Sequence, residues 1–110
     1  MLNKTISELE ERVKKADSLK GKDRTALLKL IGELKVEITN LSKTHEEEAN
    51  SIAGFAQVAA HEAMRQERNA GLFKIAQEGL EKSVEDFELT HPTLVNVIRE
   101  ISDVLSNLGI

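Results

Sequence analysis

The sequence of 110 residues contains no cysteine, no tryptophan and no tyrosine, and it has a single proline. The absence of cysteine excludes disulfides, thiolate metal sites and thiol-based catalysis. Aromatic residues make up only 3% of the chain, so a core must be built from aliphatic side chains. A helical bundle can be packed in that way, whereas a β-sandwich normally uses more aromatic and β-branched residues.

Long apolar runs and basic patches are also missing. No stretch reaches the roughly 18 consecutive apolar residues of a membrane-spanning helix, and residues 1–15 lack the apolar run of a signal peptide. The chain carries 15 basic and 19 acidic residues, without a basic stripe. We therefore expect a cytoplasmic protein that binds no nucleic acid, and a membrane partner is not favoured.

The N-terminal part, residues 1–44, has the pattern of two helices. Apolar residues recur there at alternating spacings of three and four, which is the pattern that packs one helix against another. Gly21 and Asp23 indicate a helix stop and a restart between the two seams. Together these signals predict an antiparallel hairpin. The first seam consists of Leu2, Ile6, Leu9, Val13 and Ala16, and the second of Leu27, Ile31, Leu34, Ile38 and Leu41.

The end of the second helix has two interpretations. Thr44 and Glu47 have the spacing of a capping box, which predicts that a new helix begins near residue 45. The alternative is a single helix across residues 23–69, in which the seam shifts at His45 as in a coiled-coil stutter. We favour a break, and the pattern leaves both alternatives open.

Residues 45–71 are rich in alanine and predict an amphipathic helix. At 100° per residue, small and apolar side chains share one arc, while Phe55 lies just off its edge and Val58 stands alone on the polar face. Small side chains let two helices approach closely, so we expect this face to be an interaction surface for a helix of a second copy. The candidate interaction residues are Ile52, Ala53, Ala56, Ala59, Ala60, Ala63 and Met64.

Residues 72–110 predict a pair of helices. His91 and Pro92 mark the start of the last helix, because proline is well tolerated in a first helical turn. The ending LSNLGI resembles a Schellman stop, in which Gly109 adopts a positive φ and Ile110 reaches back to Leu105.

No residue pattern indicates catalysis. His61 begins a motif like the His-Glu-x-x-His helix of zinc proteases, but Arg65 replaces the second histidine. His45 is typical of a helix end or a wet gap in packing, and His91 is typical of a helix cap. No catalytic triad, phosphate loop or paired carboxylate site stands out, so we expect no enzyme activity, no cofactor and no metal. Metal-dependent activity through His61 is the least favoured hypothesis.

An acidic cluster near the end of the fourth predicted helix lacks a local explanation, because a helix C-terminus disfavours negative charge. The cluster is either a solvated face or a binding site for a basic partner. It consists of Glu81, Glu85, Asp86 and Glu88.

The final segment FELTHPTLVNVIREISDVLSNLGI, residues 87–110, resembles a family of small bacterial proteins known as domain of unknown function 4404. The shared features are a phenylalanine with acidic residues, a His-Pro pair, an apolar-periodic helix and a Leu-Gly-Ile ending. The alanine-rich stretch departs from the pattern of the family. The resemblance implies a helical, cytoplasmic and uncharacterised protein, and it implies no catalytic residue or cofactor.

Taken together, the patterns predict one all-α domain over residues 1–110, a coiled-coil-like bundle with parts at 1–44, 45–71 and 72–110. The apolar stripes are narrow, so we expect a second subunit to complete them, with a homodimer favoured. The predicted function is that of a non-enzymatic interaction protein, self-associating and regulatory or scaffolding. The alternative is binding to a membrane surface through residues 49–69, although Arg65 and Arg68 are their only basic residues.

Overall fold

Five α-helices follow one another along the chain in the computed structural model, which describes residues 2–108. The described residues contain no strand, so the all-α class is confirmed. The helices are α1 (Leu2–Lys15), α2 (Gly21–Ser42), α3 (Glu46–Met64), α4 (Ala70–Val84) and α5 (Pro92–Asn107), and a short 3-10 helix, η1 (Glu85–Phe87), follows α4.

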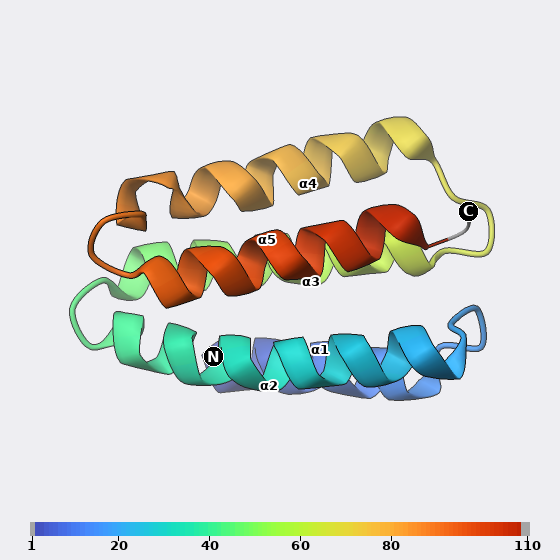
Figure 1. Cartoon of the computed structure of the whole chain (residues 1–110), viewed down its shortest axis with the longest axis horizontal. Helices are drawn as coiled ribbons and strands as arrows, with labels where there is room; N and C mark the ends of the chain where they lie inside the picture. Colours follow the sequence, from blue (N-terminus) through green and yellow to red (C-terminus); the bar gives the residue numbers. More distant parts are fainter. Residues whose placement is uncertain (1, 109–110) are drawn as a thin grey trace.

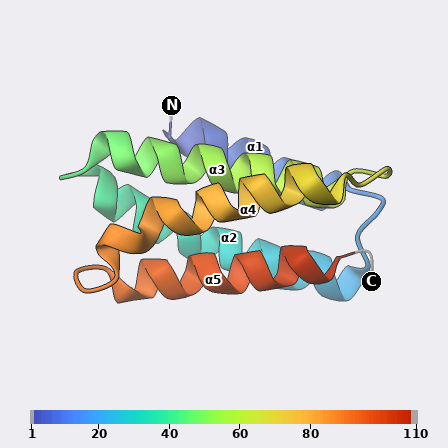
Figure 2. The ribbon, with the colours of Figure 1, turned by 90° about the horizontal axis from the view of Figure 1, so that it is seen from above.

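Successive helices run in opposite directions, and their connections lie alternately at the two ends of the bundle (Figure 1). Helices α2 and α5 lie side by side at the front of this view, and α1 and α3 lie behind them. Helix α4 runs along the top, where it contacts both α3 and α5 (Figure 2). The principal extents of 37 × 24 × 21 Å describe a short bundle.

Helix α3 is the central element, since it packs against α1, α2, α4 and α5. The alanine face of α3 allows this central position, because methyl side chains let neighbouring backbones approach closely. Several helices can therefore pack around the axis of α3. Ala49, Ala56 and Ala59 are at most 1% exposed. The small residues of the sequence therefore mark the helix at the centre of the core.

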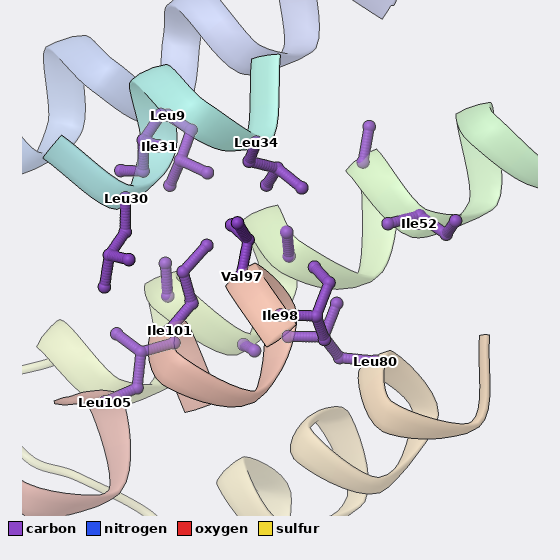
Figure 3. Packing of buried hydrophobic residues seen from close by; sticks show 14 of the residues in the cluster. Leu9, Leu30, Ile31, Leu34, Ile52, Leu80, Val97, Ile98, Ile101 and Leu105 are labelled. Carbon is purple, nitrogen blue, oxygen red and sulfur yellow. The ribbon is translucent and has the colours of Figure 1, made fainter. Parts of the chain in front are cut away.

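The two N-terminal seams face each other and the rest of the bundle. Ile6, Leu9 and Val13 of α1 are buried, as are Leu34 and Ile38 of α2. In Figure 3, side chains from all five helices converge on one apolar interior. The narrow apolar stripes, which we expected a second subunit to complete, are covered by the other helices of the same chain.

The turn between α1 and α2 differs from the sequence prediction. Gly21 is the first residue of α2 and Asp23 lies in its first turn, so neither caps a helix in the predicted manner. The Arg24 side chain instead donates hydrogen bonds to the carbonyl oxygens of Val13 and Leu19, at 3.2 and 3.3 Å, and to that of Ala16. A guanidinium carries several donors in a planar fork, so one side chain ties the last turn of α1 to the loop that follows it.

The chain breaks between α2 and α3, as favoured from the sequence, but His45 and not Thr44 is the N-cap residue. The α4–α5 connection repeats this arrangement at His91, with φ and ψ of −137° and 62° against −136° and 64° at His45. Each imidazole Nδ1 is hydrogen-bonded to the hydroxyl of the preceding threonine. The two rings lie 6.4 Å apart and both contact Phe87, so the repeated Thr-His pairs lie together at one end of the bundle.

The α3–α4 connection is longer than predicted, because α3 ends at Met64 and the alanine-rich segment does not continue to residue 71. Asn69 is the N-cap of α4, where its side-chain oxygen accepts a hydrogen bond from the backbone N–H of Leu72 at 3.0 Å. At the other terminus, the predicted Schellman stop at Gly109 and Ile110 lies outside the described residues.

Replacement of Leu34 by alanine tests the α1–α2 seam. Leu34 is fully buried, so Leu34→Ala should lower the free energy of unfolding by about 2–5 kcal/mol. The control is Val36→Ala, two positions away on the same helix, where the side chain is largely exposed and the change should be small. Urea unfolding followed by circular dichroism measures both, and equal stabilities of the two variants would contradict the assigned seam.

A charge in the alanine face tests the central position of α3. Ala56→Lys places an unpaired ammonium in the core and should cost roughly 3–5 kcal/mol of stability. Gln57→Lys is the matched control, because Gln57 is half-buried and its amide already reaches the Glu8 carboxylate at 3.3 Å. Thermal melting should separate the two variants, and an unchanged midpoint for Ala56→Lys would mean that this face is solvated.

Candidate interaction surface

The interaction residues predicted from the alanine-rich segment lie inside the bundle. Six of the seven are buried against other helices of the same chain, and Met64 is half-buried against the core. They are therefore brought together as expected, but their contacts are intramolecular. A surface for a partner has to be found among the side chains that remain exposed.

Large apolar side chains that remain exposed are few among the described residues, and most of them gather on α3 and α4. An exposed apolar patch is informative when it is contiguous, because single exposed side chains are normal on any protein. The exposed fractions are 41% for Phe55, 50% for Val58, 45% for Leu72 and 68% for Ile75 on these two helices, with 59% for Val36 on α2 and 95% for Leu89 after η1.

Contact between Phe55 and Gly79 joins the two helices within this surface. A Cβ atom at Gly79 would lie 2.6 Å from a ring carbon of Phe55, so the aromatic ring rests directly on the glycine backbone. Helices α3 and α4 run in opposite directions (Figure 2), so the register set by Phe55 and Gly79 brings Val58 level with Ile75, one turn further along. We call the surface formed by Phe55, Val58, Leu72, Ile75 and Gly79 the α3–α4 face.

The five residues of the α3–α4 face are uncharged, and the two helices that carry them also bear charges of both signs. Glu62 and Arg65 form an ion pair at 2.8 Å at the end nearest the α3 C-terminus. Lys74, Glu78 and Lys82 are exposed on the outer side of α4. An apolar centre with a polar rim is the usual anatomy of a protein interface.

His61 contributes to a different feature, a shallow hollow between α1 and α3. The Arg12 guanidinium donates a hydrogen bond to His61 Nδ1 at 2.9 Å, so this nitrogen is engaged within the protein. Lys15 and Arg65 also line the hollow. Because α1 and α3 both end here, the cations complement two helix C-termini. The hollow is thus explained by the helices themselves and needs no anionic ligand.

The three histidines are not gathered in one place. His61 is remote from the His45–Phe87–His91 cluster, which lies at the opposite end of the bundle (Figure 1). Across residues 2–108, no three histidine or carboxylate side chains are grouped as metal ligands. Nor is any of the described helices both long enough and apolar enough to cross a membrane.

The structure explains two of the four acidic residues that cluster near the end of α4. Glu81 accepts a hydrogen bond from the Ser102 hydroxyl at 3.3 Å, and Ser102 is the buried polar residue of α5. Glu88 pairs with Arg99 of α5. These contacts tie the end of α4 and the following turn to α5, and they account for charges that the helix dipole disfavours.

The α3–α4 face was missed from the sequence for a physical reason. Phe55 and Val58 are visible there as exceptions at the edge and on the polar side of the alanine arc. Leu72 and Ile75 look like members of the core stripe of α4, since apolar residues in a helix are normally assigned to its buried side. Only the rotation of α4 about its axis, set by packing of Phe73, Ala76 and Leu80, places them outside.

A double-mutant cycle tests the contact within the face. Gly79→Ala alone should fail to stabilise the protein, because the new methyl group displaces the Phe55 ring. In a Phe55→Ala background the same change should stabilise by about 1 kcal/mol, the usual gain of alanine over glycine inside a helix. Free energies of unfolding of the four proteins give the coupling, and a similar gain in both backgrounds would show that ring and glycine do not touch.

Comparison with known proteins extends the resemblance at the C-terminus. A family model described as Domain of unknown function (DUF4404) matches residues 33–110, from the middle of α2 to the end of the chain. The matched range includes the alanine-rich segment, whereas the sequence resemblance rested on residues 87–110. No curated protein and no solved structure matches the chain significantly. With most of its length covered by the match, this chain belongs to the DUF4404 family.

Proposed function

We propose that the protein is a non-enzymatic interaction protein that self-associates through the α3–α4 face. The observation that carries this proposal is the gathering of Phe55, Val58, Leu72 and Ile75 on one side of an otherwise well-buried bundle. Two copies related by a two-fold axis would each present the same surface, so every apolar side chain would be covered in a single contact.

Simple energetics predict a weak and reversible dimer. Complete burial of a large apolar side chain contributes about 1.5–3 kcal/mol, and these side chains are already about half buried. Eight of them, four from each copy, therefore supply roughly 6–12 kcal/mol. Association itself costs an estimated 4–15 kcal/mol, so the net gain reaches at most about 8 kcal/mol, which corresponds to a dissociation constant of roughly micromolar or weaker. Such a dimer suits a regulatory or scaffolding role in which partners exchange.

Charge argues for a second copy as the occupant and against a membrane surface. Residues 46–84 contain seven carboxylates and four Lys or Arg side chains. Interfacial helices usually carry a polar face rich in Lys and Arg, which attracts anionic lipids. A surface of net negative charge is repelled by the same lipids. A cytoplasmic location agrees with this proposal.

Two lysines in the α3–α4 face should abolish self-association. The Val58→Lys, Ile75→Lys variant places two like charges on each copy at the two-fold contact, while both positions remain solvent-exposed in the monomer. Sedimentation velocity at roughly 100 μM, suited to a dissociation constant in the micromolar range, should show dimer for the parent and monomer for the variant.

The control adds the same two charges elsewhere. Ser7→Lys, Thr39→Lys changes exposed positions on α1 and α2 and should sediment like the parent. A parent protein that stays monomeric over the whole concentration range, or a Val58→Lys, Ile75→Lys variant that still dimerises, would contradict the proposal. Co-sedimentation of the parent, but not of that variant, with vesicles of neutral lipid would favour the membrane alternative in its place.

A further inference from the structure

A second feature lies between α2 and α5, on the side of the bundle that faces the viewer in Figure 1, with α3 behind it. Here the two helices enclose a groove of about 430 Å³. Val36 and Val97 supply its apolar surface, and Val36 is more than half exposed. The groove is therefore distinct from the α3–α4 face in both helices and residues.

Three carboxylates, those of Glu33, Glu37 and Glu100, line this groove, and no lysine or arginine lines it with them. Thr93 and Asn96 are its uncharged polar residues. Glu33 and Glu37 are four residues apart on α2, so their side chains are neighbours of like charge and destabilise the helix. Glu100 adds a third negative charge from the facing helix.

Several other acidic residues of the chain have local explanations that these three lack. Glu46 lies in the first turn of α3, where the helix dipole favours negative charge. Glu10 pairs with Lys35 at 3.7 Å, and Glu88 pairs with Arg99. Glu33, Glu37 and Glu100 lie in the interior of their helices and form no ion pair among the described residues.

From these observations we infer that the α2–α5 groove binds a cationic amphipathic helix of a partner protein. An apolar side chain of that helix would cover Val36, and Lys or Arg side chains one turn before and after it would meet Glu33, Glu37 and Glu100. Binding would relieve the repulsion among the three carboxylates, and complementary charge at the rim provides specificity and fast association.

The charges also identify the partner as a different protein. Most of the exposed large apolar side chains among the described residues belong to the α3–α4 face, and the two helices that form it together carry more acidic than basic residues. A second copy therefore offers no cationic apolar helix to the groove. The same three carboxylates do not form a grouped metal site within residues 2–108.

Binding of a model peptide to the full chain tests the inference. The probe is a fluorescein-labelled helical peptide of leucine and lysine with leucines at alternating spacings of three and four, and its glutamate counterpart is the negative probe. Fluorescence anisotropy should show saturable binding of the lysine peptide alone. The Glu33→Gln, Glu37→Gln, Glu100→Gln variant should bind the lysine peptide with an affinity at least about tenfold lower than that of the parent, because the complementary charges are lost.

The matched control removes three charges from other exposed sites. Glu47→Gln, Glu67→Gln, Glu85→Gln should retain the affinity of the parent within about twofold, since rim charges act locally at physiological salt. Val36→Ser should weaken binding several-fold without changing any charge, which isolates the apolar contact. Equal weakening by the two glutamine triples would show unspecific attraction to an acidic protein and overturn the inference, as would full affinity in the groove triple.

Folding and self-association are separated from this result by two further measurements. Removal of like charges should leave the thermal midpoint of the groove triple equal to or above that of the parent. The Val58→Lys, Ile75→Lys variant should bind the lysine peptide like the parent, because its changes lie outside the groove. Loss of peptide binding in that variant would contradict the inference that the α2–α5 groove is a separate site. A parent protein that is monomeric and still binds the peptide would contradict only the proposed self-association.

Discussion

Close packing around the alanine face of α3 is the constraint on which the rest of the structure depends. Four helices contact α3, and they can do so because the side chains between the axes are mostly methyl groups. Each alanine contributes little hydrophobic free energy by itself, at roughly 25 cal/mol per Å² of buried apolar area. The large side chains around it, such as Leu34, Leu80 and Ile98, supply most of the burial, and they meet only because α3 is thin.

Polar side chains secure the ends of the helices around this core. Arg24 donates hydrogen bonds to carbonyl oxygens of the last turn of α1 and of the loop after it, and Asn69 caps the start of α4. Arg68 donates a hydrogen bond to the backbone oxygen of Leu108 and lies 4.4 Å from the centre of the Phe73 ring, so the α3–α4 connection is held to the end of α5. Gln77 donates a hydrogen bond of 2.7 Å to the buried Ser102 hydroxyl. Backbone groups at helix ends need hydrogen-bond partners, so these contacts stabilise the arrangement of the helices around the core.

With the core complete in one chain, function has to be sought at the surface, where two faces differ in chemistry. The α3–α4 face is apolar and uncharged at its centre, so it suits a second copy with the same surface. The α2–α5 groove combines an exposed valine with three carboxylates, so it suits a cationic helix. Since the two faces use different helices, the proposed second copy and the proposed cationic helix would not compete for the same surface. Both lie within the part of the chain matched by the family model.

Local sequence patterns predicted the helical class, the hairpin of α1 and α2 and the start of α5 at Pro92, because these features depend on residues close in sequence. They favoured a break before α3 without excluding one continuous helix, and the structure shows the break. The alanine face was also recognised as a packing surface. The helices that cover the alanine face were not predicted, since the apolar stripe of one helix does not indicate which helix packs against it. Tertiary structure decided that Ala56 and Ala60 face their own chain, that Arg24 binds a carbonyl in the last turn of α1, and that Leu72 and Ile75 are exposed. Those outcomes depend on how each helix is rotated and on contacts between distant residues, which only the packed chain determines.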